Sequence, residues 1–166
     1  MKQTEIQKIA KVMEQEKRKL FCYACCYLGD VEEAKDVLQD IFLNLCKSPE
    51  VIVNIRDLKC YIFRCLFNHC NTLVQRKNRL RILNIDSKEV AEIEDPKSND
   101  FEQEYIFING LLNTIPQEQS EVIRLHIHGE KTFREISEII GVPEASVKSR
   151  YRYGIEKLRK MIRINY

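Results

Sequence analysis

The stretch TFREISEIIGVPEASVKSRYRYGIEKL, residues 132–158, contains two helical segments separated by a glycine and a proline. Thr132 stands where a helix N-cap is expected, and Glu135, three residues later, completes a capping box. Gly141 suits the turn, and Pro143 suits the first turn of the next helix, where its missing N–H is not needed. The pattern predicts a helix-turn-helix, whose second helix enters the DNA major groove.

Helical periodicity divides the second of these helices into two faces. At about 100° per residue, Val147, Tyr151, Gly154 and Leu158 share one side and are expected to pack inward. The other side offers groups that bond to base edges or phosphates. The candidate DNA contacts are Ala145, Lys148, Ser149, Arg150, Arg152 and Tyr153. The alternative is a solvated amphipathic helix whose basic end is favoured by the helix dipole.

The rest of the chain also follows a helical pattern, which predicts an all-α fold. Only five glycines and four prolines occur in 166 residues, so long helices are favoured over turns. The helices are expected over 4–28, 31–47, 58–79, 101–113, 117–128, 132–140 and 143–163. No apolar run approaches the roughly 18–20 residues of a membrane span, and the first residues lack a signal-peptide pattern. We therefore expect no membrane insertion and a cytoplasmic location.

The net charge of +2 conceals two basic segments with an acidic segment between them. Residues 59–81 contain six basic residues and no acidic one, and residues 146–166 contain seven basic residues against one glutamate. Residues 86–104 carry eight acidic residues and two basic ones. This alternation suggests two surfaces that face polyanions. We expect an N-terminal helical bundle over 1–83, a flexible acidic linker over 84–100 and a helix-turn-helix domain over 101–166.

The N-terminal helices present two further candidate surfaces. The helix over 31–47 is expected to bury a single apolar face, formed by Ala34, Leu38, Ile41, Phe42 and Leu45. Leu43 points the other way, among Asp36, Gln39 and Asp40, and an apolar residue in an exposed acidic patch favours a protein partner. The helix over 58–79 interleaves aromatic, amide and basic residues, which suits unpaired bases, although most of these aromatics are expected in the core.

All seven cysteines lie within the first 70 residues. An odd number without an export signal favours reduced thiols. Cys60, Cys65 and Cys70 recur every five residues, which spreads them around a helix, so we expect buried small hydrophobes and no metal site. No phosphate-binding loop or nucleophile–base motif is present, and we expect neither a cofactor nor catalytic residues.

The segments 20–47 (LFCYACCYLGDVEEAKDVLQDIFLNLCK), 58–77 (LKCYIFRCLFNHCNTLVQRK) and 111–162 together resemble the extracytoplasmic-function (ECF) sigma factors of the sigma-70 family. The resemblance implies a promoter-specificity subunit that binds core RNA polymerase and promoter DNA and is controlled by an anti-sigma factor. It assigns polymerase binding to Asp36, Gln39, Asp40 and Leu43. It assigns the minus-10 element to Asn54, Arg64, Asn68, Asn71, Gln75 and Arg76, and the minus-35 element to the candidate DNA contacts above.

A second hypothesis stays open at this point. The chain would then be a helix-turn-helix transcriptional regulator whose N-terminal domain senses a ligand or a redox state through its cysteines. Such a regulator would bind duplex DNA without polymerase.

Overall fold

A computed structural model describes residues 2–83 and 100–165 of the protein, and every regular element within these ranges is helical. The elements are α1 (Lys2–Leu28), α2 (Val31–Lys47), the short 3-10 helix η1 (Pro49–Ile52), α3 (Leu58–Leu83), α4 (Asp100–Leu112), α5 (Gln117–Ile127), α6 (Phe133–Ile140) and α7 (Glu144–Asn165). The expected all-α class is confirmed for the described residues. Of the expected linker 84–100, only Asp100 is described, and it begins α4.

Local sequence signals set the helix ends. Gly29 ends α1 with a positive φ of 68°, and Asp30 caps α2 by accepting a hydrogen bond from the backbone N–H of Glu33 at 3.0 Å. Asp57 caps α3 in the same way, accepting from the N–H of Cys60 at 3.1 Å. We expected α3 to end near Arg79, but it continues to Leu83 because no glycine or proline follows to stop it.

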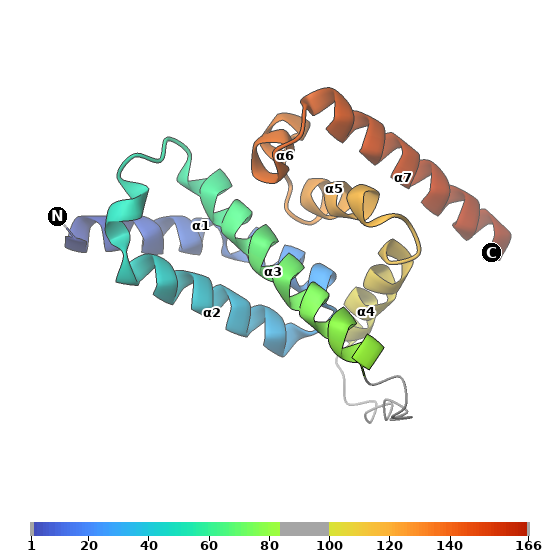
Figure 1. Cartoon of the computed structure of the whole chain (residues 1–166), viewed down its shortest axis with the longest axis horizontal. Helices are drawn as coiled ribbons and strands as arrows, with labels where there is room; N and C mark the ends of the chain where they lie inside the picture. Colours follow the sequence, from blue (N-terminus) through green and yellow to red (C-terminus); the bar gives the residue numbers. More distant parts are fainter. Residues whose placement is uncertain (1, 84–99, 166) are drawn as a thin grey trace.

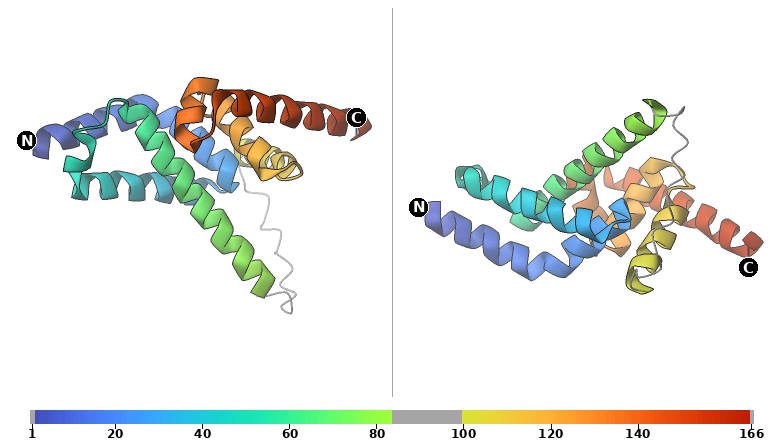
Figure 2. Two further views of the ribbon diagram at one scale, coloured as in Figure 1. Left: turned by 45° about the horizontal axis from the view of Figure 1, so that its top comes forward. Right: turned by 90° about the horizontal axis from the view of Figure 1, so that it is seen from below.

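The helices form two groups that lie side by side (Figure 1). The N-terminal half, α1–α3, packs α1 against both α2 and α3, and the C-terminal half, α4–α7, packs α5 against α6 and α7. The halves also meet directly, with α3 against α6 and α1 against α4 and α5. The two chain ends lie at opposite ends of the molecule, and α7 and the C-terminal part of α3 project beyond the packed helices (Figure 2).

One continuous apolar core runs through both halves. Tyr23 of α1 and Phe63 of α3 are fully buried and meet edge to face at 6.3 Å, and Leu125 and Ile136 extend the core into the C-terminal half. Burial of apolar surface is the main stabilising contribution to such a fold. The contact between the halves is therefore part of the hydrophobic core.

The buried face of α2 differs in detail from the expected one. Ala34, Val37, Ile41 and Leu45 are buried, whereas Leu38 and Phe42 are only half-buried. The buried residues follow a 3–4–4 spacing, and Leu38 and Phe42 pack against the core at the edge of this face. The predicted face is confirmed in part, and Val37 is the buried residue that it lacked.

Candidate nucleic-acid interfaces

The helix-turn-helix has the geometry that its sequence predicts. Thr132 accepts a hydrogen bond from the N–H of Glu135 at 3.2 Å, and the Glu135 carboxylate accepts from the N–H of Thr132 at 3.2 Å, which completes the capping box. Gly141 ends α6 in the left-handed region with a φ of 73°. The Pro143 carbonyl accepts hydrogen bonds from the N–H groups of Ser146 and Val147 in the first turn of α7. These local bonds set the angle at which α7 leaves the turn.

The inward face of α7 fixes its orientation. Val147 and Gly154 are buried, and Tyr151 and Leu158 are half-buried, as the periodicity predicts. A Cβ on Gly154 would approach the Cδ1 atom of Ile123 to 2.7 Å, so α7 and α5 pack too closely for a larger residue. Tyr151 also joins a cluster with His126 and Phe133, at ring-centroid distances of 4.8 and 5.2 Å. The spacing of these three residues in the sequence does not indicate the aromatic cluster.

The outward face of α7 is open. Ala145, Lys148, Arg152 and Tyr153 are exposed, and Ser149 is half-buried. The Arg152 guanidinium lies 5.1 Å from the Tyr153 ring centroid, so the two side chains stack on the surface. Two other candidates are held in exposed ion pairs, Lys148 with Glu144 at 3.4 Å and Arg150 with Glu118 at 3.9 Å. Exposed pairs of this kind contribute little stability, so DNA phosphates can displace them.

The candidate minus-10 residues lie along α3 and the loop before it. Five of the six are exposed: Asn54, Arg64, Asn68, Gln75 and Arg76. The sixth, Asn71, is half-buried at the contact between the halves, where its side-chain oxygen accepts hydrogen bonds from Gln117 Nε2 at 3.0 Å and from the Tyr27 hydroxyl at 3.4 Å. Phe63 and Phe67 are buried in the core. Tyr61 is the half-buried aromatic of this helix.

The candidate polymerase-binding residues form a single exposed strip on α2. Asp36, Gln39, Asp40 and Leu43 recur at intervals of three and four residues, and all four are exposed. Leu43 leaves 47% of its surface accessible, which is unusual for a leucine on a helix whose opposite face is in the core. The strip faces away from α1 and α3.

Four of the seven cysteines, Cys25, Cys26, Cys60 and Cys70, are buried as expected, and the other three are half-buried. All seven belong to the described residues and all are free thiols. Burial raises the pKa of Cys26 to about 11 and that of Cys70 to about 12. Such thiols stay protonated at neutral pH and are therefore poor nucleophiles.

Cys60 has a different environment from the other thiols. Its sulfur lies 3.8 Å from a Glu135 carboxylate oxygen. The same sulfur and one carboxylate oxygen each of Asp57 and Glu138 lie within 4.8 Å of one another, an arrangement that could hold a metal ion. Burial and the Asp57 carboxylate raise the pKa of Cys60 to about 12. The Asp57 carboxylate already caps α3. Glu138 is far from Asp57 and Cys60 in the chain, so the cysteine spacing alone does not indicate this group.

Charged residues buried between the halves were not anticipated either. Glu16 of α1 is 6% exposed and pairs at 3.8 Å with Lys131, which is 4% exposed and lies just before α6. Lys131 also lies 4.1 Å from the centroid of the Phe63 ring. Arg124 of α5 is 2% exposed and lies 4.7 Å from the Tyr27 ring centroid. A charged residue inside the apolar run VIRLHI is the signal that marks Arg124 in the sequence.

Among residues 2–83 and 100–165, no helix has both the length and the apolar character needed to cross a membrane.

The helix-turn-helix and its exposed basic face define a DNA-binding protein. The family model described as "Sigma-70, region 4" matches residues 111–160. The ECF RNA polymerase sigma factor SigL of Mycobacterium tuberculosis is 26% identical over 145 residues, which cover 84% of this chain and 80% of that protein. The ECF RNA polymerase sigma factor SigW of Bacillus subtilis is 26% identical over 161 residues, covering 85% and 82%.

Solved structures share the fold across nearly the whole chain. The structure of CnrH in complex with the cytosolic domain of CnrY matches with a TM-score of 0.74 at 16% identity, covering 96% of this chain and 90% of the other. The sigma factor RpoE of Bartonella quintana, in complex with the anti-sigma factor NepR, matches with a TM-score of 0.66 at 17% identity, covering 96% and 97%.

The chain therefore carries a sigma-70 region 4 over residues 111–160, and its matches over more than four fifths of its length support an extracytoplasmic-function sigma factor of the sigma-70 family. Its function is that of an RNA polymerase sigma factor, which is a transcription initiation factor.

Proposed function

We propose that this chain directs core RNA polymerase to promoters through three surfaces, one on α2, one on α3 and one on α7. The exposed acidic strip Asp36, Gln39, Asp40 and Leu43 binds core polymerase. Asn54, Arg64, Asn68, Asn71, Gln75 and Arg76 engage the minus-10 element as it opens. Ala145, Lys148, Ser149, Arg150, Arg152 and Tyr153 read the minus-35 duplex. The polymerase supplies the catalytic groups and this chain none, and the complex works in the cytoplasm without a cofactor bound to this chain.

The outward face of α7 carries this proposal. Its basic and hydroxyl groups are accessible, while the opposite face is held against α5 by Val147 and Gly154. A helix fixed in this way can enter a major groove without changing its own packing. Arg152 and Lys148 can form bonds to guanine edges or phosphates, and Ser149 can bond to either.

The packed arrangement of the halves corresponds, in this proposal, to a resting form. The minus-10 and minus-35 promoter elements are centred about 25 base pairs apart, which is about 85 Å along B-DNA at about 3.4 Å per base pair. Here α3 bonds to α5 through Asn71 and Gln117, and α5 packs on α7, so only about two helix diameters, or roughly 20 Å, separate the two DNA surfaces. The halves therefore have to separate before both elements are bound.

The chain between the halves is long enough for this change. We propose domains at 1–83 and 101–166, joined by the segment 84–100. Seventeen residues reach about 60 Å when extended, at about 3.3–3.6 Å per residue. The packed helices of each half, about 10 Å wide each, add to the distance that the two DNA surfaces can span.

We also propose that an anti-sigma factor binds this chain. RpoE of Bartonella quintana, which shares the fold, is found in complex with the anti-sigma factor NepR. A partner that contacts both halves at once would hold the DNA surfaces too close together for a promoter.

Transcription from a defined promoter with purified core polymerase tests the proposal. We expect promoter-dependent transcripts with the unchanged chain and at least about a fivefold loss with Arg152→Ala, since a bidentate base contact contributes roughly 1–3 kcal/mol. The matched control is Lys157→Ala, which removes the same charge from an exposed position at the edge of the outward face. Equal losses in the two variants, or tight duplex binding without polymerase, would contradict the proposal.

A further inference from the structure

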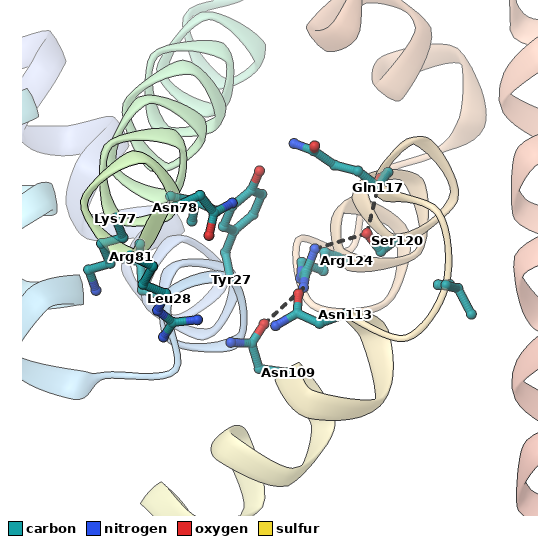
Figure 3. A pocket seen from close by; sticks show the side chains of 12 residues that line it. Tyr27, Leu28, Lys77, Asn78, Arg81, Asn109, Asn113, Gln117, Ser120 and Arg124 are labelled. Atoms are coloured by element: carbon teal, nitrogen blue, oxygen red, sulfur yellow. Dashed lines mark hydrogen bonds between the residues drawn. The ribbon is translucent and has the colours of Figure 1, made fainter. Parts of the chain in front are cut away.

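A polar pocket of about 280 Å³ lies between the two halves, and we call it the interhalf pocket. Tyr27 of α1 and Lys77, Asn78 and Arg81 of α3 form one side, and residues of α4 and α5 form the other, among them Asn109, Asn113 and Arg124 (Figure 3). The residues that line it all lie in the described part of the chain, and none of them is acidic. The pocket is thus a basic site shared by both halves.

Arg124 lines the pocket as a buried cation that has no carboxylate within ion-pair distance among the described residues, although the Glu121 charge acts on it from farther away. Its guanidinium donates to Ser120 at 3.2 Å, to Asn109 at 2.8 Å and to Asn113 at 3.1 Å, and all three acceptors are neutral. Its Nε atom has no hydrogen-bond partner. Among the ion pairs of the described residues, none involves Arg124. A charge buried in this way is costly unless an opposite charge approaches it.

Two further cations stand on the α3 side. Lys77 donates a hydrogen bond to Glu33, so its charge is partly balanced, whereas Arg81 has no ion pair among the described residues. The Asn109 and Asn113 side-chain oxygens already accept from Arg124, which leaves their NH₂ groups as donors. The pocket therefore offers two cations without an ion pair among the described residues, Arg124 and Arg81, and several neutral hydrogen-bond donors. Together these groups suit a ligand with two negative charges. The volume lies near the lower limit of small-molecule sites.

We propose that the interhalf pocket binds a small molecule carrying a phosphate group. The phosphate binds the Arg81 guanidinium together with the part of the Arg124 guanidinium that lines the pocket, since guanidinium groups suit phosphate oxygens geometrically. Arg124 is only 2% exposed, so a small ligand has to enter the pocket to meet its charge, and the backbone of a nucleic-acid strand on the surface does not meet it.

Binding at this pocket opposes separation of the halves. One wall belongs to α1 and α3 and the other to α4 and α5, so moving the halves apart divides the pocket. A ligand that binds only the packed arrangement stabilises it in proportion to its concentration above its dissociation constant. The inference goes beyond the proposed function, because it assigns a ligand that holds the resting form. It depends on the packing of the halves and not on the recognition of any promoter.

Titration of the full-length chain with inorganic phosphate and with pyrophosphate, at constant ionic strength maintained with chloride, tests the inference. Line broadening of the phosphorus NMR signal reports binding, and calorimetric Tm reports stabilisation. We expect one saturable site per chain and a Tm that rises with ligand concentration. Arg81→Gln should weaken binding about tenfold, because a hydrogen bond to a charged group contributes about 1.5–3 kcal/mol.

The matched control is Arg79→Gln, which removes the same charge from an exposed position of the same helix that does not line the pocket. It should leave the affinity unchanged. Arg124→Met, checked for folding by circular dichroism, should abolish binding. No saturable binding at millimolar phosphate, or equal losses in the Arg81 and Arg79 variants, would overturn the inference. Release of bound phosphate by single-stranded DNA would also overturn it, because the pocket would then belong to the DNA path.

Discussion

His128 shows how the contact between the halves changes the chemistry of a single side chain. It follows the last turn of α5 and is half-buried. Burial of the imidazole, together with the nearby Arg124 charge, lowers the pKa of His128 below its ordinary value of 6.5. The neutral form is therefore favoured in the folded chain.

This shift predicts an acid sensitivity that removal of the imidazole should reduce. The unfolded chain binds a proton at His128 near pH 6.5, and the folded chain does so only at lower pH. The contribution of neutral His128 to the free energy of unfolding is therefore complete above pH 6.5. It is lost as the pH falls below this value and through the lower pKa of the folded chain. Urea unfolding at pH 7.5 and pH 5.5 should show a smaller loss of stability for His128→Gln than for the unchanged chain. An equal loss in both would show that His128 does not titrate in this way.

At the scale of the elements, the turn between α6 and α7 sets the orientation of the recognition helix. The capping box begins α6, and Gly141 ends it with a φ of 73°, a conformation that costs other residues about 1–2 kcal/mol. No atom lies within 4 Å of a Cβ added at Gly141, so only the backbone conformation excludes a side chain there.

A pair of glycine substitutions separates backbone strain from helix propensity. Gly141→Ala should lower the free energy of unfolding by about 1 kcal/mol, because alanine disfavours the left-handed region. Gly110→Ala also meets no atom within 4 Å, but it lies inside α4 and should stabilise the chain by about 0.5–1 kcal/mol. Denaturant unfolding of both variants checks these opposite signs. A stabilising effect at both positions would exclude the turn geometry described here.

At the scale of the whole molecule, buried charge pairs accompany the apolar contact between the halves. Glu16 lies 3.6 Å from Lys59 within the N-terminal half and 3.8 Å from Lys131 across the contact. Lys131 in turn lies 3.8 Å from Glu135. Each half keeps one of these pairs when the halves part, Glu16 with Lys59 and Lys131 with Glu135, so separation breaks only the buried Glu16–Lys131 pair.

Removal of the Glu16 charge should loosen the packed arrangement. Breaking a buried pair by removing one partner costs about 3–5 kcal/mol, an upper limit here because Lys131 keeps Glu135. Glu16→Gln should therefore increase the mean distance between fluorophores placed on α2 and α7, and speed hydrogen exchange in α6. Glu14→Gln, an exposed position of the same helix, is the control and should change neither measurement. An unchanged distance in Glu16→Gln would argue against a role for this pair in holding the halves.

Much of the candidate site was predictable because it depends on local periodicity. The outward position of Lys148 and Arg152 and the exposure of Asp36 and Leu43 follow from helix geometry once one buried face is recognised. The burial of Asn71 was not predictable in this way, because its partners Gln117 and Tyr27 lie 46 and 44 residues away in the chain. Such partners have no local signal.

The sequence by itself determined the all-α class, the helix-turn-helix with its caps, and which faces of α2 and α7 are polar. These features follow from bonds and burial within a few residues along the chain. Only the tertiary structure decided that the halves share one core, that Glu16 meets Lys131 and that Arg124 lies in a basic pocket between them. Contacts between distant residues depend on how whole helices pack, and a linear pattern carries no record of that packing.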